Sequence, residues 1–346
     1  MVLLNERQRL LAILSLEKVD RAPCVCPMQT ATISLMKASG SFWPDAHHDP
    51  EKMAILALAA NRYAGLESVR VPFETSVDAS AFGVPTKDRR LLRQPQVLER
   101  RLLGREGFEE VDVPDPRKDG MVPVVLDAIH RIKIGAPHLP IICGIAAPHT
   151  LAFELLGQQE ADRLIDLDPV LMKATLHKAR KWAIDYATAA VEAGADVITL
   201  IDPYASGDFL TTEQYREFAL PFHRRTCQEL ERLGIPVILH ICGNATSNLA
   251  LMAETGACGI SIDHEVDVRQ AKKLLAGKSA VIGNLNPAGA MLRGAPFEVE
   301  SETRACLEAG VDATSPGCGL ALETPLENLR SFVESTRRFG AKVPEG

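Results

Sequence analysis

Short runs of β-branched and other apolar residues recur along the C-terminal two thirds of the 346-residue chain, and longer stretches of helical periodicity separate them. Six such runs cover residues 140–144, 196–202, 236–242, 259–263, 280–284 and 312–317. The stretches 172–192 and 213–233 have a helical pattern, and a glycine follows each of them. Glycine commonly follows a last helical turn because it enters the left-handed conformation without penalty. Alternating strands and helices predict an α/β fold with a parallel sheet.

Two further apolar runs near the N-terminus, at 22–27 and 68–73, bring the expected strands to about eight, the number that closes a (β/α)8 barrel. We therefore predict a single TIM-barrel domain over residues 1–346, with an N-terminal helical extension. A doubly wound open sheet is the alternative. Residues 82–121 are rich in charge and proline and interrupt the rhythm, which predicts an irregular or hairpin insertion after the second βα unit.

Composition excludes some classes of partner. The chain has 38 Lys and Arg against 45 Asp and Glu, a net charge of −7, so it has no excess positive charge for nucleic acid or an anionic membrane. No apolar run reaches the ~18 residues that cross a bilayer, and charges interrupt the N-terminal segment, so a cytoplasmic location is expected. Eight scattered cysteines then favour thiol chemistry or metal ligation over a disulfide framework.

The sharpest local signal is the sequence His240-Ile-Cys242-Gly243 at the end of an expected strand. Because side chains alternate along a strand, His240 and Cys242 project to the same face. Cys318 follows the last expected strand in a loop of small residues. In a closed barrel the fifth and eighth strands end at the same mouth, and a His/Cys/Cys set with an open fourth position fits catalytic zinc.

These residues belong to motifs that resemble the uroporphyrinogen decarboxylase superfamily, and within it the zinc-dependent methylcobamide:coenzyme M methyltransferases. The resemblance covers nearly the whole chain. Its motifs are residues 19–23, 67–73, 239–244, 282–287, 315–319 and 324–328. The H-x-C-G-N motif at 240–244 together with the late P-G-C-G at 316–319 is typical of the methyltransferase branch.

The resemblance implies a TIM barrel in which His240, Cys242 and Cys318 bind zinc and carry the catalysis. It also implies a methyl group that passes from a methyl-Co(III) corrinoid, held on a separate carrier protein, to a small thiol such as coenzyme M. A thiol bound to zinc is deprotonated at neutral pH, because the metal stabilises the thiolate. A thiolate positioned in line with the Co–CH₃ bond is the nucleophile that this transfer needs.

Members of the decarboxylase branch of the superfamily have a sequence similar to M-R-Q-A-G-R after the first strand. Its two arginines bind the acidic side groups of a porphyrinogen. Here Met28 and Thr32 occupy the arginine positions, although Gln29 is retained. A cluster of carboxylates without cationic partners is poorly held, so porphyrinogen decarboxylation is disfavoured. A different acceptor such as tetrahydrofolate or homocysteine, a small methyl donor, and a non-catalytic corrinoid-binding role remain open alternatives.

Six polar residues near strand ends are further candidates for substrate binding. They are Gln29, Glu74, Asp202, Asn244, Asp263 and Asn284. Glu74 is expected either to contact the acceptor or to be a fourth zinc ligand, with a solvated strand-end carboxylate as the alternative. Asp202 is expected to orient His240 or to cap the following helix. Asp263 is the expected inward member of Asp263–Glu265, and the two asparagines either donate hydrogen bonds to substrate or stabilise turns.

Overall fold

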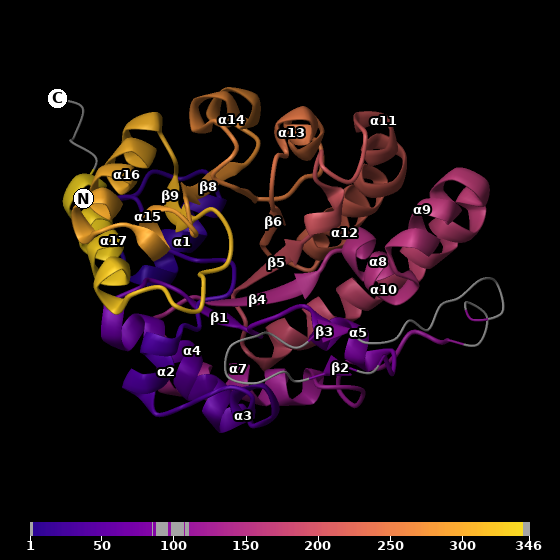
Figure 1. Cartoon of the computed structure of the whole chain (residues 1–346), viewed down its shortest axis with the longest axis horizontal. Coiled ribbons are helices and arrows are strands. Elements are labelled where there is room, and N and C mark those ends of the chain that lie inside the picture. Colours follow the sequence, from indigo (N-terminus) through magenta and orange to yellow (C-terminus); the bar gives the residue numbers. More distant parts are fainter. Residues whose placement is uncertain (1–2, 85, 88–95, 98–106, 108–110, 342–346) are drawn as a thin grey trace.

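A curled parallel sheet organises the computed structural model, which describes residues 3–84, 86–87, 96–97, 107 and 111–341 (Figure 1). The sheet has seven strands in the order β1-β4-β5-β6-β7-β8-β9, and each strand is parallel to its neighbours. The strands are β1 (Val69–Val71), β4 (Ile141–Ala146), β5 (Val197–Ile201), β6 (Val237–Ile241), β7 (Gly259–Ile262), β8 (Ala280–Leu285) and β9 (Ala313–Pro316). The strand order never reverses, as it would in a doubly wound sheet, so that alternative is wrong.

The expected first strand, residues 22–27, is not a strand in the structure. It forms an isolated parallel bridge between Cys24 and Thr314 of β9. On its other side the carbonyl oxygen of Cys24 accepts a 2.9 Å hydrogen bond from the amide of Glu67, just before β1. The segment thus contacts both edges of the sheet. Pro23 and Pro27 have no N–H to donate, which prevents a regular ladder here.

Helices surround the sheet, and the long ones follow the expected periodicity. They are α1 (Glu6–Leu14), α2 (Ile33–Ser39), α3 (Asp45–His48), α4 (Pro50–Ala64), α5 (Ser76–Ala81), α7 (Val122–Gly135), α8 (Pro148–Leu156), α9 (Gln158–Leu167), α10 (Pro169–Ala193), α11 (Thr212–Gln214), α12 (Leu220–Arg232), α13 (Leu249–Met252), α14 (Val268–Leu275), α15 (Ala290–Arg293), α16 (Pro296–Ala309) and α17 (Leu326–Phe339). Asp168 caps α10 by accepting from the Leu171 amide, and Gly194 ends that helix.

The helix expected over 213–233 is interrupted. It divides into α11, a π-helical turn at Tyr215–Ala219, and α12. Pro221 lacks the N–H that would bond four residues back, so the regular helix starts again at this point. The interruption places Tyr215 and His223 beside the end of β5, where they form part of a buried polar cluster that includes Asp202.

Helix α1 covers one end of the sheet and leaves the other end for the site. Leu10, Ile13 and Leu14 of α1 pack in one buried cluster with Ile238 of β6 and Ala280 of β8, near the start of these strands. The carboxyl ends of the strands therefore remain available for polar side chains, as is usual for parallel α/β folds. No helix among the described residues is long and apolar enough to span a membrane.

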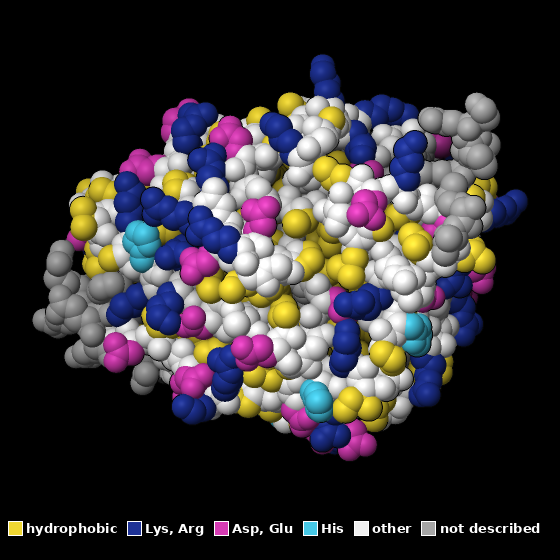
Figure 2. Space-filling view, turned by 180° about the vertical axis from the view of Figure 1, so that it is seen from behind, with side chains coloured by type: hydrophobic (Ala, Val, Ile, Leu, Met, Phe, Trp, Pro, Cys, Tyr) yellow, Lys and Arg dark blue, Asp and Glu magenta, His cyan; other side chains and the backbone are white. Residues whose placement is uncertain are grey.

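The expected insertion at 82–121 is described only in part. Within it, β2 (Thr86–Lys87) and β3 (Gln96–Val97) form a short antiparallel pair. Much of the remaining segment lies outside the described residues, so its overall form stays a prediction, as does the single-domain organisation over 1–346. On the face turned away from Figure 1, basic and acidic side chains are interspersed with apolar ones (Figure 2).

Candidate active site

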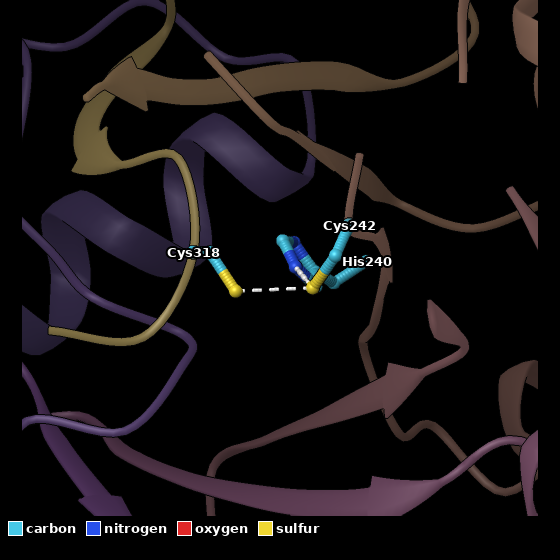
Figure 3. Close-up of side chains that lie close together, drawn as sticks. All are labelled: His240, Cys242 and Cys318. Atoms are coloured by element: carbon cyan, nitrogen blue, oxygen red, sulfur yellow. Dashed lines mark hydrogen bonds between the residues drawn. The ribbon is translucent and has the colours of Figure 1, made fainter. Parts of the chain in front are cut away.

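One imidazole and two thiols converge at the carboxyl ends of the strands (Figure 3). His240 is the fourth residue of β6, and Cys242 follows the strand directly, so the two side chains share a face. Gly243 adopts a φ of 72°, a left-handed conformation that turns the chain sharply after Cys242. Cys318 comes from the loop after β9. The sequence predicted this set of three residues, and the fold brings them together.

The donor atoms of the three residues lie within 4.8 Å of one another. His240 Nε2 is 2.8 Å from Cys242 Sγ, and Cys242 Sγ is 3.0 Å from Cys318 Sγ. The sulfur–sulfur distance exceeds the ~2.05 Å of a disulfide, and both cysteines are free thiols. Zn²⁺ binds imidazole nitrogen at about 2.0 Å and thiolate sulfur at about 2.3 Å, so this donor set fits one zinc ion with a fourth position open to a ligand.

The two thiols share a hydrogen bond that separates their acidities. Donation from Cys242 stabilises the thiolate of Cys318, which lowers the pKa of Cys318 well below its usual value. The same hydrogen bond, together with burial, raises the pKa of Cys242. The pair therefore favours one negative charge in the absence of a cation, and this charge makes the cluster attractive to a metal ion.

Ser261 fixes the orientation of the imidazole. It lies opposite His240 in the β6–β7 register, and its Oγ shares a 2.9 Å hydrogen bond with His240 Nδ1. Both side chains are fully buried. Histidine ligands in metal sites commonly bind a neighbouring group through the second nitrogen, which directs the first toward the metal. Sequence reasoning missed Ser261, although its register opposite an inward-facing histidine is a usable signal once the strands are paired.

A cavity of about 290 Å³ adjoins the two sulfurs. Its described lining is mainly apolar. Besides the two cysteines, it contains four polar or charged side chains, those of Gln29, Arg70, Glu74 and Thr75. The lining residues are Met28, Gln29, Arg70, Phe73, Glu74, Thr75, Ile201, Pro203, Cys242, Cys318, Gly319 and Leu320. Two of the six candidate binding residues, Gln29 and Glu74, are thus beside the thiols. Arg70, in the middle of β1, was not among the sequence candidates.

Glu74 and Gln29 have distinct surroundings in this cavity. The Glu74 carboxylate accepts a hydrogen bond from Ser76, but burial dominates and raises its pKa to about 7. Gln29 Nε2 donates to the carbonyl oxygens of Ala31 and Leu320, at 3.0 and 2.6 Å. Gln29 thereby holds the loop that carries Cys318, while its Oε1 has no hydrogen-bond partner among the described residues. Roles for both residues toward a substrate stay predictions.

Asp202 lies next to β6 but does not orient His240. Its carboxylate accepts hydrogen bonds of 2.6 Å from Thr150 Oγ1 and from His223 Nε2, and Tyr215 contacts the other nitrogen of His223. His149 and His223 together lower the pKa of Asp202, although complete burial by itself would raise it. Its side chain makes no capping hydrogen bond to the short helix that follows. The partner of His240 is Ser261, and Asp202 belongs to a separate buried cluster.

The remaining three candidates contact the backbone around the site. Asp263 Oδ2 accepts a 3.1 Å hydrogen bond from the Gly243 amide and so supports the turn after Cys242. Asn284 Nδ2 donates to the carbonyl oxygens of Asp263 and Val266. Asn244 is exposed, and its Oδ1 accepts from the Thr246 amide. These residues do not line the cavity, and their expected contacts with substrate stay predictions.

The sequence model described as uroporphyrinogen decarboxylase (URO-D) matches residues 5–339. The chain is 37% identical over 335 residues to the methylcobamide:CoM methyltransferase MtbA of Methanosarcina acetivorans, covering 96% of this chain and 98% of that one. It is 34% identical over 339 residues to the methylcobamide:CoM methyltransferase MtaA of Methanosarcina barkeri, covering 97% and 98%. The chain belongs to the uroporphyrinogen decarboxylase family and, within it, to the methylcobamide:CoM methyltransferase branch.

The fold comparison agrees with this assignment. A solved methyltransferase from Methanosarcina mazei superposes with a TM-score of 0.94 at 34% identity, covering 97% of this chain and 99% of that chain. The family and the branch that the motifs predicted are therefore confirmed. The match confirms the α/β part of the predicted fold, with its curled parallel sheet, whereas the sheet has seven strands and not the eight of the predicted barrel.

Proposed function

We propose that this protein transfers a methyl group from a methylated corrinoid, presented by a carrier protein, to the sulfur of coenzyme M or a similar small thiol. The observation that carries the proposal is the convergence of His240 Nε2 with the sulfurs of Cys242 and Cys318 beside a cavity. Membership of the methyltransferase branch supports it, because the relatives are named for transfer between methylcobamide and CoM.

The three side chains would hold Zn²⁺, and the bound metal would supply Lewis acidity that favours the thiolate form of an acceptor. Ser261 keeps Nε2 of His240 directed toward the sulfurs. Glu74 is the only carboxylate among the described residues that line the cavity, so it is placed to accept the proton that the acceptor thiol loses. The thiolate sulfur then forms a bond to the methyl carbon, and the cobalt–carbon bond breaks with its electron pair remaining on cobalt.

The size of the cavity fits a small acceptor. Its volume of about 290 Å³ is just below the range of small-molecule sites, roughly 300–1,000 Å³. A corrinoid ring is far larger than a short thiol and must approach from outside. This supports a corrinoid that arrives on a separate protein and docks over the carboxyl ends of the strands, with the acceptor already inside.

The test uses the full-length protein loaded with zinc, methylcobalamin as the methyl donor, and coenzyme M, homocysteine and tetrahydrofolate as acceptors. We expect methylated coenzyme M by mass spectrometry, together with the absorbance change of dealkylated cobalamin. Cys242→Ala should lose stoichiometric zinc and at least about 10³-fold in rate. Cys258→Ala, a partly buried cysteine outside the cluster, is the control and should retain both. Full activity of the Cys242 variant without metal would overturn the proposal.

A further inference from the structure

Arg70 is a fully buried arginine that forms no ion pair with a carboxylate in the described part of the chain. It lies in the middle of β1 with 1% of its surface exposed. Its Nη1 donates to the carbonyl oxygen of Pro72, and its Nε has no hydrogen-bond partner among the residues that the structure describes. No carboxylate in the described part of the chain lies within 4.0 Å of its guanidinium, whereas buried Arg9 is paired with Asp20 at 2.8 Å.

An unpaired buried charge is strongly unfavourable, and burial accordingly lowers the pKa of Arg70. The fold nevertheless makes room for this guanidinium. A Cβ on Gly144 of the neighbouring strand β4 would collide with it, so only glycine leaves the space that Arg70 occupies. A bulky cation therefore sits in a space where a small apolar residue would be the more stable choice if packing alone mattered.

Arg70 belongs to the lining of the cavity that adjoins the two thiols. Arg70, Cys242 and Cys318 all line it, and Glu74 is the only other charged side chain in the described lining. Much of the remaining wall is apolar, including Met28 and Phe73. A thiol ligand with its sulfur near the two cysteines would therefore contact apolar side chains and one cation, Arg70. The Nε donor of this arginine is available for a further hydrogen bond.

We propose that Arg70 is the residue that binds the anionic group of the methyl acceptor, a sulfonate or a carboxylate carried by the small thiol. The guanidinium presents a planar fork of N–H donors that suits both oxyanions. Glu74 acts on Arg70 electrostatically but forms no ion pair with it, so an anionic ligand would supply the direct counter-charge that the described residues do not. This inference rests on the proposed function in one respect, since the ligand is taken to be a thiol that accepts a methyl group. Anion binding by Arg70 can be tested without methyl transfer.

The first experiment measures anion binding without any methyl transfer. The probes are ethanesulfonate and propionate, which lack a thiol, and calorimetry with the zinc-loaded protein gives their dissociation constants. We expect the wild-type protein to bind at least one of them and Arg70→Met to bind it at least tenfold more weakly, with Arg70→Lys intermediate. The two probes distinguish a sulfonate from a carboxylate site. Equal binding by wild type and Arg70→Met, or no binding of either probe by wild type, would overturn the proposal.

The melting temperature distinguishes an arginine that binds a ligand anion from one that only stabilises the fold. Arg70→Met should keep or raise the melting temperature, because it removes an unpaired buried charge, while Arg9→Met should lower it, because it leaves Asp20 without its partner. The probe anion should raise the melting temperature of the wild type but not that of Arg70→Met. A large loss of stability in Arg70→Met, with no stabilisation of the wild type by either anion, would show that the residue is structural.

The second experiment follows methyl transfer from methylcobalamin to 2-mercaptoethanesulfonate, 3-mercaptopropionate and the neutral 2-mercaptoethanol. Arg70→Met should lower the ratio of kcat/KM for the anionic over the neutral thiol at least tenfold, mainly through KM. An unchanged ratio would contradict the role of Arg70. If the wild type binds ethanesulfonate but methylates no thiol, the proposed function fails while the anion site stands, so the two failures are distinguishable.

Discussion

His240 and His223 are both completely buried histidines with two contacted ring nitrogens, but their surroundings differ. The partners of His223 are Asp202 and Tyr215, which are themselves fully buried. His240 contacts Ser261 on one side and the partly exposed Cys242 on the other, next to a cavity. In the first cluster both ring nitrogens of His223 contact buried protein groups, whereas in the second the two sulfurs line a cavity. This difference indicates that the His223 cluster stabilises the fold and that the His240 cluster binds a ligand.

The largest expected effect comes from removing the histidine of the metal cluster. His240→Ala takes away one of three donors, so zinc affinity and methyl transfer should each fall by at least about 10³-fold. The free energy of unfolding, measured without metal so that zinc binding does not contribute, should change less than it does for His223→Ala. His130→Ala, at an exposed histidine on α7, should leave zinc content and rate unaltered. Tight zinc binding by His240→Ala would break the distinction between the two clusters.

The matching change in the second cluster should affect stability. His223→Ala leaves Oδ2 of the buried Asp202 carboxylate without its histidine partner, which is expected to lower the free energy of unfolding by about 3–5 kcal/mol. Chemical denaturation of the metal-free protein measures this loss. The folded variant should still bind one zinc. His177→Ala, at an exposed histidine on α10, is the control. Loss of zinc at full stability would assign His223 to the active site instead.

A smaller effect should follow from the residue that orients His240. Ser261→Ala removes the hydrogen bond to Nδ1 but keeps all three donors, so zinc should bind about 10–100-fold more weakly. Competition with a chelator measures this affinity. Ser279→Ala removes another buried serine hydroxyl, one that donates to the Ala257 carbonyl, and should leave zinc affinity intact. An affinity in Ser261→Ala equal to that of the wild type would show that packing alone holds the imidazole.

The smallest expected effect concerns Glu74, which lines the cavity without touching the cluster. Glu74→Gln should slow methyl transfer about tenfold, less than the roughly 10²–10⁴-fold typical of a general base, because the acceptor proton can also leave by another route. Since the pKa of Glu74 is about 7, the wild-type rate should fall below pH 7 as the carboxylate is protonated, and the variant should lose this step. Glu265→Gln, at an exposed glutamate, should keep the profile. A pH profile of Glu74→Gln identical to that of the wild type would exclude Glu74 as the proton acceptor.

The same substitution has a stability effect of defined sign. Burial raises the pKa of Glu74 above its ordinary 4.5, so the folded state binds more protons than the unfolded state between these values. Its contribution to stability is present below about pH 4.5 and is lost as the pH rises through about 7. Glu74→Gln should therefore stabilise the protein relative to wild type at pH 8, by roughly 1–3 kcal/mol, and much less at pH 4.

Most of the fold was predictable because strand and helix periodicities are properties of neighbouring residues. Every expected strand except 22–27 has a counterpart in the sheet. That segment failed because Pro23 and Pro27 remove donors from the ladder, so it makes one bridge only. The helix over 213–233 was predicted as continuous, but Pro221 interrupts it. In both cases a proline overrode an apolar pattern that was otherwise correct.

The sequence by itself determined which chemical groups lie at strand ends, and that His240 and Cys242 share a face, because a strand alternates with a period of two. Only the tertiary structure placed Cys318, 76 residues after Cys242, within 3.0 Å of its sulfur. It also decided that Asp202 pairs with His223 while Ser261 orients His240, and that Arg70 is buried beside the thiols. These pairings depend on the register and curvature of the whole sheet, which no local pattern records.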